Sequence, residues 1–365
     1  MAEIKLEAVE KRFGELTAVR ASSFTVRDGE FFVILGPSGC GKTTTLRMIA
    51  GLELPSAGRI LLDGQDVTFK RASLRDVAFV FQLFALYPHM NVRRNIGFPL
   101  LCQGMPRGEI RTRVEEAAKI LRVQHLLDQP VSGLSGGDRQ RVALGRAIVR
   151  RPKAFLMDEP LGALDAELRA LMCGELRALH DRLTTTTVYV THDQLEAMAM
   201  ADTILVMNQS VIEQCGSPQA IYDRPASMFV ADFIGDPPMN LLRLPSTLRV
   251  GASRVGMNGA SVNVPEIRED VGETEVAVGV RPEHVRFRDE GSLRGRVVGT
   301  EYLGTTQLVT VTTQHGVLKA RLPSDVPVEI GANVGLTFAT ERLSVFDARS
   351  GRAIKTARYD GSRNG

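Results

Sequence analysis

The fold of this sequence is decided by Gly36-Pro37-Ser38-Gly39-Cys40-Gly41-Lys42-Thr43, which directly follows the apolar run Phe31-Phe32-Val33-Ile34-Leu35. The stretch matches the pattern G-x-x-x-x-G-K-[ST], in which glycines let backbone N–H groups turn inward around phosphate oxygens. A helix that begins near Lys42 points its positive end at the same oxygens. Lys42 supplies a point charge to β- and γ-phosphates, and the Thr43 hydroxyl is placed to coordinate the Mg²⁺ between them. The stretch therefore predicts a strand, a phosphate-binding loop and a helix, in that order.

Buried strands and amphipathic helices alternate from this stretch outward, up to about Gly235. Short, continuous apolar runs indicate strands that are covered on both faces, and they lie at 31–35, 77–81, 154–157 and 187–190. Helical patterns lie at 109–122, 138–150 and 164–183. This alternation predicts a three-layer α/β domain with a largely parallel core over residues 1–235, with a helical subdomain at about 85–150.

Two adjacent carboxylates, Asp158 and Glu159, end the strand at 154–157. The carboxyl ends of strands form the usual ligand edge of such sheets, so we expect both side chains near the phosphate loop. Asp158 can hold Mg²⁺ directly or through water. Glu159, on the other side of the strand, is placed to polarise an attacking water, a general-base role that typically contributes ~10²–10⁴ in rate.

Beyond Gly235 the pattern changes to short Val- and Thr-rich runs punctuated by Gly and Pro. The segment Asp236-Pro237-Pro238-Met239 marks the boundary, and the runs lie at 275–280, 293–298, 308–313, 317–322 and 334–338. Their spacing predicts a small barrel or sandwich of the oligonucleotide/oligosaccharide-binding kind over residues 236–355. The polar tail at 356–365 is expected to be disordered.

Composition excludes several classes of protein. With 44% hydrophobic and 24% charged residues, the chain is globular rather than collagen-like, coiled-coil or largely disordered. A net charge of +3 gives no argument for a nucleic-acid partner, and we expect none. The N-terminus shows no secretory signal, and no stretch approaches the ~18 apolar residues that a membrane-spanning helix needs. The four cysteines lie too far apart for a zinc pattern, so we expect a cytoplasmic protein.

A second phosphate-binding device lies at Leu134-Ser135-Gly136-Gly137-Asp138. A serine and two glycines immediately before a helix offer a hydroxyl and backbone N–H groups to an anion. The stretch resembles the LSGGQ signature of the nucleotide-binding domains of ABC transporters. It departs from the family at Asp138, where a glutamine is usual. The added carboxylate favours the helix dipole and can weaken phosphate affinity, but we expect activity to be retained.

Further positions match this family in order along the chain. Phe13 stands where an aromatic residue stacks on adenine, and Gln82 matches the Q-loop glutamine that reaches the metal and the attacking water. The stretch 161–165 resembles the D-loop, and His192 matches the switch histidine that contacts the γ-phosphate. The resemblance implies catalytic roles for Glu159, His192 and Gln82, and metal ligation by Thr43, Gln82 and Asp158. The nucleotide-binding residues that it implies are Phe13, Gly36, Ser38, Gly39, Cys40, Gly41, Lys42, Thr43, Thr44, Ser135, Gly136, Gly137 and Asp165.

In this family two cassettes face each other, and ATP lies between the phosphate loop of one and the signature of the other. The resemblance therefore implies that a lone chain lacks complete sites, that its partner is a second copy of itself, and that ATP and Mg²⁺ are its cofactors. ATP favours the joined state through contacts made only there, and hydrolysis then releases the pair.

The later motifs resemble those of the maltose-type cassette, the ATPase of carbohydrate importers. The stretches 216–218, 221–226, 229–235 and 238–240 resemble its junction, and 279–284 resembles the start of its C-terminal regulatory barrel, a domain of the TOBE type. The segment 85–92 corresponds to the region that lines the groove for a coupling helix of the membrane subunits. The resemblance implies two integral-membrane permease subunits as partners, with an extracytoplasmic solute-binding protein as an indirect one. It places the chain at the cytoplasmic face of the inner membrane, as a peripheral protein.

The imported solute stays open between a sugar, a polyol and glycerol 3-phosphate, and polyamine, ferric-iron and oxyanion importers share the architecture. A soluble ABC ATPase of chromosomes or ribosomes is the alternative class. Chromosome-type members separate the two motifs by long coiled coils, whereas Ser135 follows Lys42 by only 93 residues here. Ribosome-acting members generally carry two cassettes, and this sequence shows one. Binding of a regulator by the barrel could coexist with transport.

Overall fold

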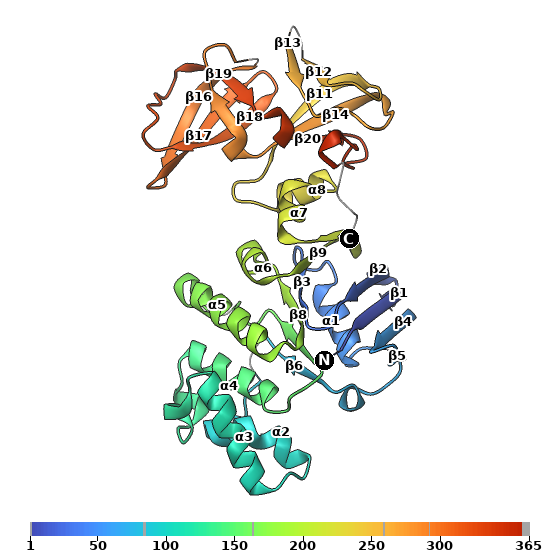
Figure 1. The fold of residues 1–365 in the computed structure, drawn as a ribbon, viewed down its shortest axis with the longest axis vertical. Coiled ribbons are helices and arrows are strands. Elements are labelled where there is room, and N and C mark those ends of the chain that lie inside the picture. The colour runs from blue at the N-terminus through green and yellow to red at the C-terminus, as the bar shows by residue number, and fades with distance from the viewer. Residues whose placement is uncertain (1, 83–84, 163, 258–259, 292, 360–365) are drawn as a thin grey trace. The chain divides into compact units, whose positions relative to one another are not determined.

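Figure 1 shows the chain in a computed structural model, which describes residues 2–82, 85–162, 164–257, 260–291 and 293–359. The chain forms two compact units, residues 1–218 and residues 219–365. Each unit has its own hydrophobic core, because apolar residues from the different sheets of the unit gather in one cluster.

A largely parallel sheet with the strand order β10-β9-β3-β8-β7-β6 forms the centre of the first unit. Its strands are β3 (Phe31–Leu35), β6 (Val77–Val80), β7 (Ala154–Asp158), β8 (Thr186–Thr191), β9 (Thr203–Asn208) and β10 (Val211–Gly216). Pairing is parallel except between β9 and β10. Every residue of β3, β7 and β8 is buried, because this sheet is covered on both faces.

A second, antiparallel sheet with the order β2-β1-β4-β5 packs on the other side of α1 (Lys42–Ala50). Its strands are β1 (Ile4–Phe13), β2 (Leu16–Val26), β4 (Ala57–Leu62) and β5 (Gln65–Asp66). One core cluster joins Ile4 of β1, Leu46 of α1 and Val190 of β8. The helix that follows the phosphate loop is therefore held between two sheets, which fixes the direction of its N-terminus.

The remaining helices of the first unit are α2 (Val92–Cys102), α3 (Arg107–Ile120), α4 (Gly136–Ile148), α5 (Ala166–Leu183) and α6 (Gln194–Met200). Figure 1 shows α2, α3 and α4 gathered as a helical subdomain, at the end of the unit away from the antiparallel sheet. Side chains of Asn91, Ser135, Asp165 and Asp193 cap the N-termini of α2, α4, α5 and α6 by accepting backbone N–H groups.

The α/β fold class expected from the sequence is confirmed. The strands expected at 31–35, 154–157 and 187–190 correspond to β3, β7 and β8, and the one expected at 77–81 ends at Val80. The helices expected at 109–122, 138–150 and 164–183 correspond to α3, α4 and α5, each with a start displaced by two residues. The antiparallel sheet of β1, β2, β4 and β5 was not expected.

Within its described residues, the second unit is all-β apart from two short helices and single helical turns. One sheet has the order β15-β19-β16-β17-β18, another has the order β11-β14-β20, and β12 pairs with β13. The strands are β11 (Asn240–Leu248), β12 (Arg254–Met257), β13 (Ala260–Asn263), β14 (Gly272–Val280), β15 (Val285–Phe287), β16 (Leu293–Tyr302), β17 (Thr306–Thr313), β18 (Gly316–Pro323), β19 (Asn333–Phe338) and β20 (Ser344–Asp347). Val278, Val297 and Val309 belong to one core shared by both main sheets. This barrel-like arrangement confirms the expected class of the second domain.

The second unit begins at Gln219 and so includes α8 (Met228–Phe233) and all but the first residue of α7 (Pro218–Asp223), whereas the change in composition predicts a boundary between 235 and 236. Arg281, which is 2% exposed, explains the difference. Its guanidinium donates to the carbonyl oxygens of Tyr222 at 2.9 Å and Ala231 at 3.1 Å, and also to that of Ile234. These contacts hold both helices on the β domain, so the compact units divide at Pro218.

The ordered chain extends further than the sequence analysis predicts. Thr356 is buried and forms a β-bridge with Ile267, and Ala357–Tyr359 forms a 3₁₀ turn. The backbone N–H of Ala357 donates to the Glu266 carbonyl oxygen at 2.7 Å, which ties this segment to the domain. The rest of the predicted tail, 360–365, lies outside the described residues. Within the part of the chain that the structure describes, no helix is both long and apolar enough to cross a membrane.

Candidate active site

The phosphate loop between β3 and α1 requires glycine at two positions. A Cβ atom at Gly36 would lie 2.2 Å from the Met207 carbonyl oxygen. At Gly41, where φ is +104°, it would lie 2.4 Å from the Ala18 carbonyl oxygen. Only glycine permits these close approaches and the positive φ. Gly41 directly precedes α1, so the first N–H groups of that helix lie at the loop.

Lys42 lies inside the loop, with only 4% of its surface exposed. Its Nζ donates to the carbonyl oxygens of Gly36 at 2.9 Å and Pro37 at 3.0 Å. These two contacts hold the ammonium group at the centre of the loop, where β- and γ-phosphates of a nucleotide need a cation.

The other loop residues differ in exposure. Ser38 and Gly39 are exposed, and Thr44 is half-buried in the first turn of α1. Cys40 is buried in the core of the unit, and burial raises the pKa of its thiol. The Cys40 side chain therefore packs beneath the loop as a neutral group and offers no charge to a nucleotide.

Two of the predicted metal ligands, Thr43 and Asp158, are in direct contact: the Thr43 hydroxyl donates to Asp158 Oδ1 at 2.8 Å. Asp158 is 5% exposed, and burial raises the pKa of its carboxyl although Thr43 donates to it. A divalent cation would compensate for that burial. Gln82, the third predicted ligand, is exposed where β6 ends beside β7. Hydroxyl, carboxylate and amide oxygens are ligands that Mg²⁺ accepts, so this donor set fits Mg²⁺.

Glu159, Gln82 and His192 meet at the carboxyl ends of β6, β7 and β8. Glu159 Oε2 lies 3.0 Å from His192 Nδ1 and accepts from Gln82 Nε2 at 3.4 Å. The backbone of Glu159 is in the left-handed region at φ +43°, and its N–H donates to the Val190 carbonyl oxygen at 3.0 Å. A non-glycine residue adopts this conformation rarely, and it occurs here directly after a buried strand. The Glu159 side chain is 18% exposed, so water can reach the carboxylate.

In the signature stretch, Ser135 is engaged by the residue that departs from the family pattern. The Asp138 N–H donates to Ser135 Oγ at 3.2 Å, and the Ser135 hydroxyl donates to Asp138 Oδ2 at 2.7 Å. Arg141 Nη1 lies 3.5 Å from Asp138 Oδ1. Ser135, Gly136 and Gly137 thus lie at the start of α4 as expected, and the Asp138 carboxylate accepts the hydrogen bond that the serine hydroxyl donates.

Phe13, Asp165 and Ser135 each have contacts outside the phosphate loop. Phe13 ends β1, is 47% exposed, and has Lys11 Nζ 4.7 Å from its ring centroid. Asp165 caps α5 by accepting from the Leu168 N–H at 2.9 Å. Within the described residues, none of the three forms a hydrogen bond to the loop 36–43.

A polar network that joins β8, the start of α6 and Arg169 of α5 is not predicted from the sequence. Glu196, 4% exposed, accepts from Tyr189 Oη and Thr191 Oγ1, both at 2.7 Å. Arg169 Nη1 lies 3.0 Å from Asp193 Oδ2. One signal was available, because Asp193-x-x-Glu196 has the spacing of a capping box at a helix start. Its link to Arg169, on another helix, leaves no local trace in the sequence.

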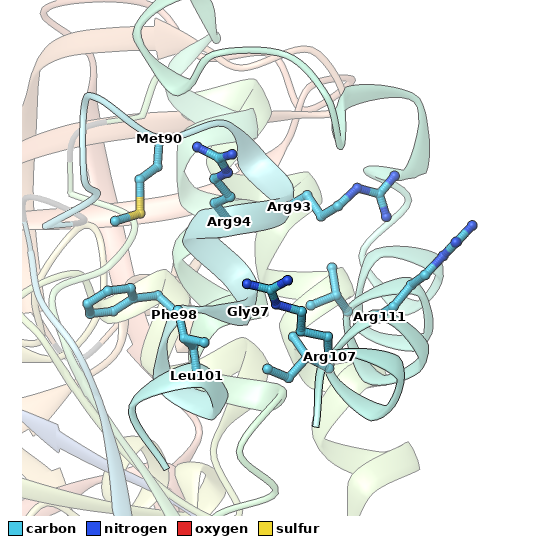
Figure 2. A pocket seen from close by; sticks show the side chains of 10 residues that line it. Met90, Arg93, Arg94, Gly97, Phe98, Leu101, Arg107 and Arg111 are labelled. Carbon is cyan, nitrogen blue, oxygen red and sulfur yellow. The ribbon is translucent and has the colours of Figure 1, made fainter. Parts of the chain in front are cut away.

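An apolar groove lies between α2 and α3, and Figure 2 shows the side chains that line it. Its volume is about 610 Å³. Apolar side chains of Phe98, Leu101 and Val114 line it together with arginines at its rim, and Met90 brings the predicted docking segment 85–92 to its edge. The arginines are Arg93, Arg94, Arg107 and Arg111.

Family profiles match both parts of the chain. The profile described as "ABC transporter" matches residues 19–162, and the one described as "TOBE domain" matches residues 278–346.

Curated relatives cover nearly the whole chain. The trehalose/maltose import ATP-binding protein MalK of Thermococcus litoralis is 46% identical over 97% of this chain and 100% of its own length. The trehalose import ATP-binding protein SugC of Mycobacterium tuberculosis is 46% identical, over 96% of this chain and 98% of its own. The sn-glycerol-3-phosphate import ATP-binding protein UgpC 2 of Agrobacterium fabrum is 43% identical over 98% of this chain and 95% of its own length.

Solved structures resemble the first unit. The cbiO1 protein of Clostridium perfringens, described as part of the ABC transporter complex cbiONQ, has a TM-score of 0.57 and 28% identity, over 60% of this chain and 89% of its own. The ATP-binding cassette MJ0796, solved as a dimer bound to ADP and Pi, has a TM-score of 0.53 and 31% identity, over 59% of this chain and 98% of its own.

Proposed function

This chain belongs to the ABC transporter family, as an ATPase subunit that powers import, and from that premise we propose that its cargo is a sugar, a polyol or glycerol 3-phosphate. The relatives named for trehalose, maltose and glycerol 3-phosphate align along almost the full chain, including the second unit. The observation that supports ATP hydrolysis most directly is the meeting of Gln82, Glu159 and His192 beside the pair of Thr43 and Asp158.

Phosphate binding is assigned to the loop 36–43 and the start of α1. The Lys42 ammonium, now shared by two carbonyl oxygens, offers its charge to the β- and γ-phosphates. Backbone N–H groups at the start of α1 stabilise the same negative charge. Thr43, Asp158 and Gln82 would hold Mg²⁺, which supplies Lewis-acid stabilisation of charge on the phosphate oxygens when bound.

Glu159 is assigned as the general base that accepts a proton from the attacking water. Its carboxylate is fixed from two sides, by Gln82 Nε2 at 3.4 Å and by His192 Nδ1 at 3.0 Å. These contacts restrict rotation of the side chain, and a base must be held within hydrogen-bond reach of the proton that it removes. His192 is 55% exposed, so an incoming phosphate can reach its side chain.

A second copy of the chain is proposed to complete each site. Ser135, Gly136 and Gly137 form a helix start that offers N–H groups to an anion, and within the described residues Ser135 forms no hydrogen bond to the loop 36–43 of the same chain. The related cassette MJ0796 was solved as a dimer bound to ADP and Pi, which supports a paired arrangement. In the proposed pair the signature of one copy meets the nucleotide held by the loop of the other.

We expect Asp138→Gln to lower the ATP concentration needed for half-maximal hydrolysis about fivefold, as removal of a like charge worth ~1 kcal/mol at a helix start implies. The change also frees the Ser135 hydroxyl, which now donates to Asp138 Oδ2. Steady-state hydrolysis over a range of ATP concentrations measures the effect. Asp181→Asn, which removes an exposed carboxylate paired with Arg177, is the control. An unchanged or higher ATP requirement would contradict the inhibitory role of Asp138.

Membrane permeases are the proposed partners of the groove between α2 and α3. A groove lined by both apolar side chains and arginines suits an amphipathic helix that also carries acidic side chains. Binding to such permeases would place the chain at the cytoplasmic face of the inner membrane as a peripheral subunit. An extracytoplasmic solute-binding protein would then act on the complex indirectly.

We expect Tyr87→Asp to reduce co-purification with the permeases about tenfold and to leave hydrolysis by the isolated chain within twofold of wild type. The Tyr87 ring centroid lies 4.7 Å from that of Phe98, a lining residue of the groove, so the substitution places a charge beside the apolar floor. Leu74→Asp, at a position that is 69% exposed and not part of the groove, is the matched control. Equal recovery of the permeases with both variants would count against the docking surface.

The cargo is tested with the chain reconstituted with its permeases and binding protein in proteoliposomes. Hydrolysis should be stimulated by trehalose, maltose, a polyol or glycerol 3-phosphate, and the same solute should accumulate inside. Stimulation by a polyamine, ferric iron or an oxyanion alone would assign the chain to one of the other importer classes. Hydrolysis that no permease affects would favour a soluble ABC ATPase.

A further inference from the structure

The ionic network behind His192 takes no part in the steps proposed above. We propose that Arg169 is a positioning residue for hydrolysis, which ties the backbone at the start of α5 to the turn that carries His192. The inference rests on the roles proposed for Glu159 and His192. It concerns how those two groups are held relative to each other, rather than any contact of Arg169 with the nucleotide.

Glu196 forms the buried end of the network. It accepts hydrogen bonds from Tyr189 and Thr191, both on β8, with Oε2 as the shared acceptor. Burial raises the pKa of the Glu196 carboxyl, and the neighbouring Asp193 acts in the same direction. Two carboxylates therefore lie close together in a site with little water, an arrangement that calls for a cation.

Arg169, in the first turns of α5, supplies that cation. Its Nη1 lies 3.0 Å from Asp193 Oδ2, and its Nε lies 3.7 Å from Glu196 Oε1. Its Nη2 donates to the Leu164 carbonyl oxygen at 2.9 Å. One planar guanidinium thus spans two helices and the backbone that precedes α5, a geometry that a single ammonium group cannot reproduce.

These contacts close a ring that includes the catalytic pair. From Glu159 the chain runs a few residues to Leu164, whose carbonyl oxygen is held by Arg169. Arg169 holds Asp193, the residue after His192, and His192 Nδ1 returns to Glu159 Oε2 at 3.0 Å. A closed ring restricts the movement of His192 relative to Glu159. Opening it at Arg169 leaves the direct contact between Glu159 and His192, but removes the second tie between the segments that carry these two residues.

Arg177, two turns further along α5, provides a matched control. Its Nη1 donates to the Met200 carbonyl oxygen and to Asp202 Oδ1, both at 2.8 Å, so it also joins α5 to the end of α6. The two arginine side chains are similarly exposed, 30% for Arg169 and 31% for Arg177. Their removal should cost similar stability, but only Arg169 belongs to the ring with His192 and Glu159.

The test compares Arg169→Met, Arg169→Lys and Arg177→Met in the full chain, with thermal unfolding, binding of a fluorescent ATP analogue and steady-state hydrolysis measured for each. We expect Arg169→Met to lower kcat about tenfold, since small misplacements of catalytic groups have effects of that order, with ATP affinity within twofold of wild type. The kcat of Arg169→Lys should fall about threefold, because lysine keeps the charge but cannot reproduce the contacts of the three guanidinium nitrogens. Arg177→Met should stay within twofold at an equal loss of thermal stability.

A kcat for Arg169→Met within twofold of wild type would overturn the inference, as would an equal loss in Arg177→Met. If Arg169→Met does not fold, Arg169→Lys carries the test, and an unchanged kcat in that variant overturns the inference. Glu159→Gln is measured alongside. Hydrolysis at the wild-type rate in Glu159→Gln would contradict the proposed catalytic site itself. If Glu159→Gln loses hydrolysis and Arg169→Met keeps the wild-type kcat, only the role of Arg169 is ruled out.

Discussion

Replacement of Glu159 by glutamine is expected to lower steady-state ATP hydrolysis by at least ~10²-fold while leaving nucleotide binding intact. An amide has the size of the carboxylate and can still contact Gln82 and His192, but it cannot accept a proton from water. The phosphate loop and the contact of Thr43 with Asp158 do not involve Glu159, so the nucleotide should still bind. Hydrolysis and binding are therefore expected to separate in this variant.

The separation is measured by phosphate release and by titration with a fluorescent ATP analogue on the same preparation. Glu116→Gln is the matched control, because Glu116 is exposed on α3 and forms an ion pair with Arg151 at 3.1 Å. An exposed pair of that kind contributes little, ~0–1 kcal/mol, so the control should hydrolyse ATP as the wild type does. Wild-type turnover in Glu159→Gln would remove Glu159 from the role of general base.

Lys42→Ala and Ser135→Arg are each expected to abolish hydrolysis, and an equal mixture of the two chains is expected to regain part of it. Lys42→Ala removes the charge held in the phosphate loop. Ser135→Arg replaces the hydroxyl at the start of α4 by a bulky cation. In a mixed pair the intact loop of one chain can meet the intact signature of the other, so about a quarter of the sites become complete if pairing is random.

The mixing experiment is read by phosphate release, and sedimentation with and without ATP follows the pairing. The controls are mixtures of each variant with itself, which should stay inactive at the same total concentration. Recovery well above a quarter would contradict complementary sites in trans. A fully active chain that sediments as a monomer both with and without ATP would contradict the proposed pair.

The strands beside the site could be predicted because their residues carry a strong local signal. Continuous apolar runs at 31–35, 154–157 and 187–190 indicate strands buried on both faces, and the structure places them in the central sheet. The antiparallel sheet was missed for a physical reason. Its strand β1 is half-exposed, with polar residues between Ile4, Leu6 and Val9, and it pairs with β4, more than fifty positions further along the chain.

The boundary between the two units shows a similar limit. A change in composition near Gly235 is visible in the sequence. The buried side chain of Arg281, however, holds α7 and α8 on the second unit. Arg281 lies more than forty residues beyond α8 in the sequence, and no spacing rule links an arginine to the carbonyl oxygens of a distant helix.

By itself, the sequence determined the chemistry that depends on local backbone geometry. This chemistry comes from turns and helix starts that neighbouring residues form together. The residues are Gly41, Lys42 and Thr43 at the start of α1, and Ser135 at the start of α4. Only the tertiary structure decided which distant groups meet. The convergence of Gln82 and His192 on Glu159 and the ring through Arg169 both depend on side-chain directions. Those directions follow from packing in the whole unit, because a contact between separate elements has no counterpart in the order of residues along the chain.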